Sequence, residues 1–277
     1  MPDPTALRKL LRSNLSIPTM PAVVQKINSL IENPETGTRD IGELVSEDGP
    51  LTAKVLRIAN SAYYGLASEC RTTEHASTIL GVNVLKNIVT QVAVINQFAN
   101  LEAETGFKVS DIWHRASLTA QIASLMSREA HNVRILSPEE FYVCGLLHKI
   151  GQVVMLDSIG KPYAQLLKRA ADAGASALAT ETAALGFNHQ DVGAVVAKRW
   201  DLPDAVVDAI QYHGTPFKEI GPRLHVHLIT VSSRIARYLL VGENDAASAM
   251  LLSNCEALGM DPERSIQLLE RVDLSAA

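Results

Sequence analysis

Apolar residues recur at helical spacing along nearly the whole chain, and this pattern constrains the fold more than any other feature of the sequence. In 50–61, Leu51, Val55 and Ile58 fall at i, i+4 and i+7, with charged residues on the opposite side. The same kind of spacing runs through 21–33 and 82–99. No segment offers several consecutive strand-like alternations, so the sequence predicts an all-α fold of about fourteen helices.

Local signals predict where several of these helices begin and end. Pro50 suits a first helical turn, and Ser137-Pro-Glu-Glu140 has the form of a capping box. His189 stands at an expected helix start, and His213 closes a helix that begins near Pro203.

One polar stretch, 99–108, separates two long helical patterns and contains Gly106. It divides the chain into an N-terminal helical lobe, 1–109, and a C-terminal lobe, 110–277. Because the stretch is too short to act as a flexible tether, we expect the two lobes to share one core and to unfold as one cooperative unit.

Composition and charge exclude several classes of protein. Of 277 residues, 47% are hydrophobic and 20% are charged, which is unlike a disordered chain. The formal net charge is −5 and neither lobe is basic. A broad electrostatic footprint for nucleic acid or for an anionic membrane is therefore not expected.

Cysteine usage points to a reducing compartment. Cys70, Cys144 and Cys255 are far apart and form no CxxC motif, which argues against a disulfide framework and against a thiolate zinc site. The sequence shows neither a signal-peptide pattern nor an apolar run long enough to cross a membrane. We therefore expect a soluble, cytoplasmic protein.

Histidines are the unusual polar residues on the apolar helical faces. His148 shares a face with Phe141 and Cys144, and His189 and His213 lie at helix ends. Three such histidines could converge on a metal ion, because imidazole is a good ligand of first-row metals. The alternative is that each is a neutral core histidine with a local hydrogen bond.

Other catalytic patterns are weaker. The GxSxG, GxGxxG, HExxH and P-loop templates are absent. Asp157, Glu181 and Asp191 are scattered carboxylates, which we interpret as solvated or helix-capping rather than as an acid–base pair.

A set of longer motifs narrows the range of protein families to which the sequence can be compared. Residues 145–151 read GLLHKIG, and residues 48–52 read DGPLT and are followed by VLRIANSAYYG at 55–65. Shorter motifs are PTMP at 18–21, ILG at 79–81, HQDVG at 189–193 and WDLP at 200–203. Together they resemble the HDOD family, the HD-related output domains of bacterial signalling proteins. The resemblance spans about 15–240 of the sequence and implies an N-terminal helical lobe packed on an HD-like C-terminal lobe.

The same resemblance implies that the metal site of the HD superfamily is degenerate here. Catalytic HD proteins hold a divalent ion with an H…HD…D ligand set. His148 stands at the paired His position, but Lys149 replaces the Asp. Arg115 replaces the earlier His, with His114 one residue away. A lysine charge about 4 Å from a divalent ion would be repelled by roughly 8 kcal/mol at an effective dielectric of ~20, so no metal and no cofactor are expected.

The final Asp of the HD set falls near Ser232 or Ser233, so at most two of four ligands survive. We therefore predict a non-catalytic signal-transduction module that acts by binding a signalling protein of unknown identity. One alternative is a metal-dependent phosphohydrolase acting on a nucleotide or phosphate ester. Another is a regulatory pocket for a small ligand such as a nucleotide, formed by Arg115, His148, Lys149, His189 and His213, with the two cations on its phosphate.

The NSAYYG stretch at 60–65 has two readings of its own. Asn60 and Ser61 can bond backbone groups and end the helix, with Gly65 in a left-handed conformation. Alternatively, Asn60, Ser61, Tyr63 and Tyr64 form an interaction surface, because tyrosines are favoured at interfaces.

Overall fold

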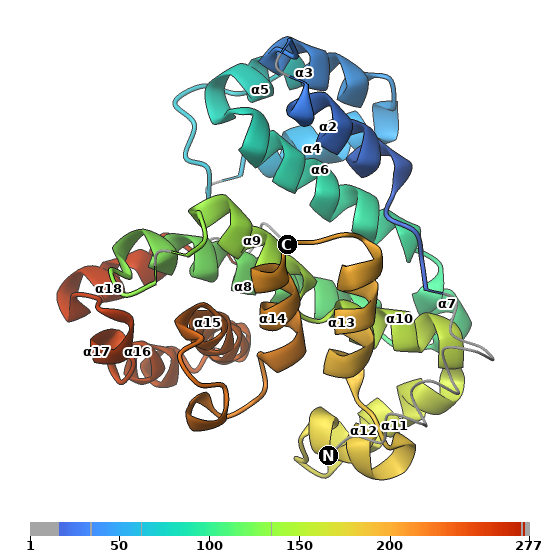
Figure 1. Ribbon diagram of the computed structural model, residues 1–277, viewed down its shortest axis with the longest axis vertical. Coiled ribbons are helices and arrows are strands. Elements are labelled where there is room, and N and C mark those ends of the chain that lie inside the picture. The colour runs from blue at the N-terminus through green and yellow to red at the C-terminus, as the bar shows by residue number, and fades with distance from the viewer. Residues whose placement is uncertain (1–16, 34, 62, 134, 273, 275–277) are drawn as a thin grey trace. The chain divides into compact units, whose positions relative to one another are not determined.

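The computed structural model describes residues 17–33, 35–61, 63–133, 135–272 and 274. Throughout this part of the chain the backbone forms seventeen α-helices and one 3-10 helix, without a strand (Figure 1). The all-α prediction is confirmed. The structure has more helices than the sequence predicts, because it contains helices as short as α7 (Leu101–Thr105) and α17 (Cys255–Leu258). A helix of about one turn has too few residues to show a helical period. None of the described helices is long and apolar enough to cross a membrane.

The chain forms two compact units. One contains residues 20–97 and the described residues after 269, and the other contains 98–269 and residues 17–19. The polar stretch 99–108 holds helix α7, which ends at Gly106 with a positive φ of 70°. The sequence-based boundary at 109 is the first residue of α8 (Val109–Glu129). Cooperative unfolding of the two parts stays a prediction.

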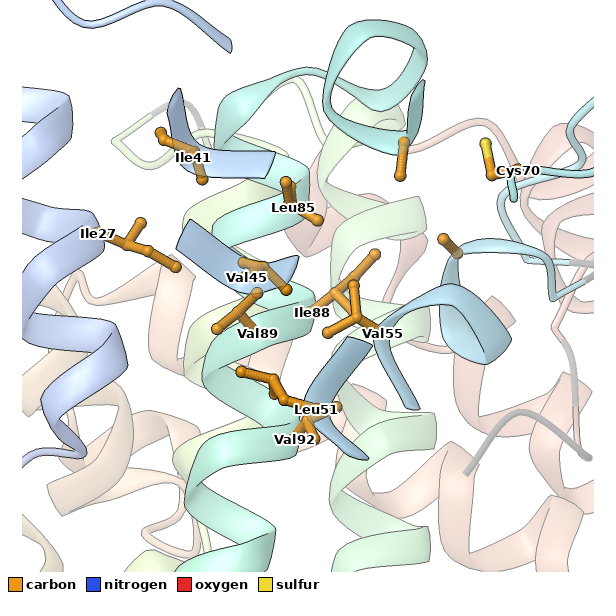
Figure 2. Packing of buried hydrophobic residues seen from close by; sticks show 12 residues of the cluster. Ile27, Ile41, Val45, Leu51, Val55, Cys70, Leu85, Ile88, Val89 and Val92 are labelled. Carbon is orange, nitrogen blue, oxygen red and sulfur yellow. The ribbon is translucent and has the colours of Figure 1, made fainter. Parts of the chain in front are cut away.

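The unit of residues 20–97 consists of five helices around one apolar core. They are α2 (Ala22–Glu32), α3 (Thr38–Ser46), α4 (Gly49–Ala59), α5 (Thr73–Leu80) and α6 (Val82–Gln97). Figure 2 shows buried aliphatic side chains of α2, α3 and α4 gathered against α6: Ile27, Ile41, Val45, Leu51, Val55, Leu85, Ile88, Val89 and Val92. The predicted apolar stripe of 50–61 therefore faces the core, with Ile58 only partly buried. Asp48 caps α4 by accepting the N–H of Leu51 at 2.9 Å.

The unit of residues 98–269 carries the remaining helices. After α7 and α8 come α9 (Pro138–Leu147), α10 (Ile150–Ile159), α11 (Lys161–Asp172), α12 (Ala177–Leu185), α13 (His189–Arg199), α14 (Asp204–Tyr212), the 3-10 helix η1 (Phe217–Glu219), α15 (Leu224–Leu240), α16 (Asn244–Leu252), α17 and α18 (Pro262–Leu269). Helix α8 packs against α9 and α15, and α13 packs against α10 and α14. The predicted capping box at Ser137 and the helix start at His189 are both present.

Two glycines of the GLLHKIG motif permit close helix crossings. A Cβ atom at Gly145 would lie 2.5 Å from Cα of Ala120 on α8. At Gly151 it would overlap the carbonyl oxygen of His189 and lie 2.7 Å from the backbone nitrogen of Gly193. Only glycine therefore fits where α10 meets α13, and this crossing brings the residues before α10 next to the start of α13.

Candidate functional site

The five side chains of the predicted pocket come from different helices of the 98–269 unit. Arg115 lies on α8, and His148 and Lys149 form the junction between α9 and α10. His189 is the first residue of α13, and His213 follows α14. The three histidines are buried, whereas Arg115 and Lys149 are partly exposed.

The imidazole rings of His148, His189 and His213 form one cluster. The ring centroids of His148 and His213 are 4.9 Å apart in an edge-to-face arrangement, and those of His189 and His213 are 5.4 Å apart. The structure thus brings together three residues that are far apart in sequence. We refer to them below as the histidine cluster.

Each ring of the histidine cluster has its Nδ1 atom next to an oxygen that can only accept. For His148, His189 and His213 these oxygens are the carbonyl of Gly145 at 2.6 Å, the carboxylate of Glu181 at 2.7 Å and the carbonyl of Ile210 at 2.8 Å. The Nδ1 atoms therefore carry the hydrogen, and each neutral ring keeps its Nε2 lone pair as an acceptor.

Ser233 on α15 connects His148 to Arg115. Its hydroxyl lies 3.0 Å from Nε2 of His148 and donates to it. A guanidinium NH2 group of Arg115 donates to the hydroxyl and carbonyl oxygens of Ser233, both at 3.3 Å. The hydroxyl of Ser232 instead faces the sulfur of Met126. Of the two serines considered from sequence, Ser233 is the one in the site.

Lys149 contacts the other end of the histidine cluster. Its Nζ atom lies 3.0 Å from Nε2 of His189, which accepts the hydrogen bond. The Nε2 lone pairs of both His148 and His189 are thus occupied by groups of this chain. Nε2 of His213 and Nε of Arg115 are buried and have no hydrogen-bond partner within the described part of the chain.

Glu181 on α12 is a site residue that sequence reasoning misjudged. Its carboxylate is fully buried and accepts from the backbone N–H of His189 at 2.8 Å, the ring of His189 and the hydroxyl of Tyr163 at 2.7 Å. The helix-capping interpretation is correct, because the carboxylate meets the positive end of α13. The solvated interpretation is wrong, because a single residue in an irregular apolar pattern carries no sign of its burial.

Burial keeps the histidine cluster neutral. Burial and then the charge of Lys149 lower the pKa of His189 to about 4, although Glu181 acts in the opposite direction. The same two causes lower the pKa of His148 and of His213 well below 6.5. Desolvation would raise the pKa of Glu181, but its bonds and charge interaction with His189 and the bond from Tyr163 lower it. The carboxylate is therefore ionised at neutral pH.

Burial and a neighbouring cation lower the pKa of both Lys149 and Arg115. Burial, followed by the charge of Arg115, lowers the pKa of Lys149 to about 7. Burial and the charge of Arg237 lower the pKa of Arg115 to about 10. Near neutral pH, Lys149 therefore exists in both its charged and its neutral form.

The donor set at this site does not fit the divalent ion of catalytic HD proteins. Within the described residues, no three His, Cys, Asp or Glu side chains are arranged to hold a metal ion. The Glu181 carboxylate lies on the Nδ1 side of His189, and the groups at the Nε2 atoms of His148 and His189 are a hydroxyl and an amine. The guanidinium of Arg115 bonds to that hydroxyl, and both it and the amine repel a cation when charged.

The NSAYYG stretch belongs to the other unit. The side-chain amide of Asn60 donates to the carbonyls of Leu56 at 2.9 Å and Cys70 at 2.8 Å, and its oxygen accepts the N–H of Cys70 at 2.7 Å. Asn60 thus ends α4 and closes the following loop, as its structural reading predicts. Tyr63 and Tyr64 pack edge to face with ring centroids 4.7 Å apart. The interaction surface proposed for Asn60, Ser61, Tyr63 and Tyr64 stays a prediction.

Sequence comparison identifies the family. The HDOD domain matches residues 17–216, which is most of the chain, and the chain belongs to this family. An uncharacterized protein of Treponema pallidum (strain Nichols) is 27% identical over 197 residues. The match covers 71% of this chain but only 37% of that relative, which is a much longer protein.

Solved structures share the fold. A protein from Shewanella amazonensis SB2B named "Putative phosphohydrolase" is 24% identical, with a TM-score of 0.77 and coverage of 99% of this chain and 96% of that one. An HDOD domain protein of unknown function from Geobacter sulfurreducens is also 24% identical, with a TM-score of 0.74 and coverage of 96% and 93%. A "Putative signal transduction protein" from Marinobacter aquaeolei VT8 is 22% identical, with a TM-score of 0.72 and coverage of 98% and 63%. At these identities the similarity concerns the fold alone.

Proposed function

We propose that this protein is a non-catalytic signal-transduction module that acts by binding another protein. The observation that carries the proposal is the contact between Lys149 and His189. An HD-type metal would need the histidine lone pairs free and a carboxylate at position 149. Here an amine stands at that position and occupies the lone pair of His189 at 3.0 Å.

The opposite side of the site supports the same proposal. Ser233 stands near the expected place of the last HD aspartate and bonds to His148 and Arg115. A neutral hydroxyl flanked by a guanidinium is a poor replacement for a carboxylate ligand. Without a bound metal, no water of lowered pKa is available as a nucleophile at neutral pH.

The competing proposal is a metal-dependent phosphohydrolase, and the name of the Shewanella protein prints phosphohydrolase without mention of a metal. The two proposals predict different metal contents for the purified protein. Elemental analysis of protein purified without chelator should find iron, manganese and zinc each far below one ion per chain. Near-stoichiometric metal would favour the hydrolase.

A second experiment concerns the protein partner. Lys149→Met removes the charge at the site, and Tyr63→Ala with Tyr64→Ala alters the NSAYYG stretch. Affinity purification from the source cells, compared quantitatively among wild type and these variants, should recover the same partner with Lys149→Met and lose it with the tyrosine variant. Loss of the partner with Lys149→Met alone would contradict the interaction surface assigned to Tyr63 and Tyr64.

A further inference from the structure

Positive charge accumulates at the candidate site. Arg115 and Lys149 are joined through Ser233 and the histidine cluster, and both are partly exposed. Arg237 lies four residues after Ser233 on α15, so it is on the same helical face one turn further on, and it is exposed. Its charge acts on Arg115, and the charge of Arg115 acts on Lys149.

Little negative charge compensates these cations, although the guanidinium of Arg237 lies over the ring of Tyr238, 5.1 Å from its centroid. The ion pairs among the described residues include none of Arg115, Lys149 and Arg237. The carboxylate that acts favourably on Lys149 is Glu181, whose oxygens already accept three hydrogen bonds from His189 and Tyr163. The site therefore holds an excess of positive charge in a partly desolvated environment.

Unused hydrogen-bonding capacity lies in the same place. Among the described residues, Nε of Arg115 is a buried donor without an acceptor. The same residues give Lys149 one acceptor, the ring of His189, although an ammonium group has three N–H donors. Buried donors in folded proteins are rarely left without an acceptor, and a charged donor without one is more costly than a neutral one.

We propose that Arg115 and Lys149 bind a phosphoryl group of a small anionic ligand and that Arg237 binds a second one. A phosphoryl group is favoured over a carboxylate because a dianion matches several cations better than a single charge does. The guanidinium fork suits phosphate oxygens, and a lysine adds a point charge beside it. Arg237, further out and exposed, is placed to meet a second phosphoryl group.

This inference goes beyond the proposed function and is independent of it. Binding requires neither hydrolysis of the ligand nor a protein partner. The test can therefore fail while the non-catalytic proposal stands, and the reverse also holds.

Calorimetric titration of the full chain with inorganic phosphate and with pyrophosphate, at constant ionic strength, tests the proposal. We expect saturable binding of one pyrophosphate per chain, tighter than that of phosphate. Arg115→Gln and Lys149→Met should each weaken pyrophosphate binding about tenfold or more, which corresponds to loss of a charge-assisted contact.

Two exposed arginines of α15 provide a matched comparison that does not disturb the core. Arg237→Gln should weaken pyrophosphate binding more than phosphate binding. Arg234→Gln removes the same charge from the same helix but from a position one residue after Ser233, on another face, so it should change binding less than about twofold. Absence of saturable binding, or equal weakening by both arginine variants, would overturn the proposal.

Discussion

Nζ of Lys149 lies 3.0 Å from Nε2 of His189, so an amine of the chain occupies the lone pair that a metal ion would use. The contact depends on the close crossing of α10 and α13 at Gly151. It joins a cation to a neutral histidine that a buried carboxylate, Glu181, holds in one tautomer. The predictions below follow from this arrangement.

The first prediction concerns Lys149 at alkaline pH. Its pKa is about 7 in the folded chain and near its ordinary 10.5 in the unfolded chain. Between these values the unfolded state binds more protons, so the free energy of unfolding should rise with pH through this window because of Lys149. Thermal unfolding at a series of pH values measures this effect.

Lys149→Met separates this contribution from those of other groups. Subtracting the two pH profiles removes the shared effects of tyrosines, cysteines and other lysines. The difference in unfolding free energy between wild type and Lys149→Met should change between pH 7 and 10.5 and stay constant above pH 10.5. Parallel profiles would mean that Lys149 keeps its ordinary pKa in the folded protein.

The second prediction concerns the histidine cluster at acid pH. The folded pKa of His189 is about 4, and those of His148 and His213 lie well below 6.5. As pH falls below about 6.5, the unfolded chain takes up protons that the folded chain does not. The histidine cluster should therefore lower the free energy of unfolding as pH falls below about 6.5, before the carboxylates titrate.

His213→Asn retains a side-chain donor near Ile210 but cannot titrate, so it should have a shallower pH dependence between 6.5 and 4.5. Denaturant titrations of the wild type and the variant at each pH give the two slopes. An unchanged slope in His213→Asn would show that His213 is protonated as readily in the folded chain as in the unfolded chain.

The third prediction concerns Glu181. Glu181→Gln keeps the size of the side chain but faces three donors with a single oxygen and an NH2 group, so at least one buried donor loses its acceptor. We expect it to cost about 3 kcal/mol or more in unfolding free energy. Tyr163→Phe removes only one of these bonds and should cost less. Chemical denaturation gives both values, and a smaller cost for Glu181→Gln would contradict the hydrogen-bond network.

The fourth prediction concerns Gly151. Gly151→Ala places a Cβ atom against backbone atoms of α13, which cannot move without shifting the helix. We expect a loss of about 2 kcal/mol or more. Gly49 begins α4 with open space around its Cα, so Gly49→Ala should change stability by less than about 1 kcal/mol. Similar denaturation midpoints for the two variants would count against the tight crossing.

Much of the fold could be predicted because the chain's local signals agree with one another. The stripe of Leu51 and Val55 faces the core, and Pro50 and Ser137 lie at helix starts as expected. Short helices such as α7 were missed because a single turn shows no period. Periodicity reports only on the face that each helix buries, so the partners of each helix within its unit could not be inferred from it.

The site was predicted in part. The pattern of apolar helical faces singled out His148, His189 and His213, and the motif resemblance added Arg115 and Lys149. The structure brings the three rings together, with Lys149 on His189 and Arg115 linked to His148 through Ser233. Glu181 and Tyr163 lie outside those motifs, and their roles depend on how α11 and α12 fold back onto α13. Such a contact between side chains distant in sequence leaves no spacing signal. Ser233 could be assigned only to a pair of neighbours, because the exact register of α15 is a tertiary property.

The most direct test of the non-catalytic proposal compares wild type with the double variant Lys149→Asp, Arg115→His. Both are titrated calorimetrically with manganese, and hydrolysis of a phosphodiester and of a cyclic dinucleotide is followed in the same samples. The wild type should show neither saturable manganese binding nor manganese-dependent turnover. The double variant, which removes two cations and adds a carboxylate and an imidazole, should bind manganese measurably, with affinity falling at acid pH as its ligands protonate. Tight manganese binding by the wild type, with metal-dependent turnover, would contradict the proposal.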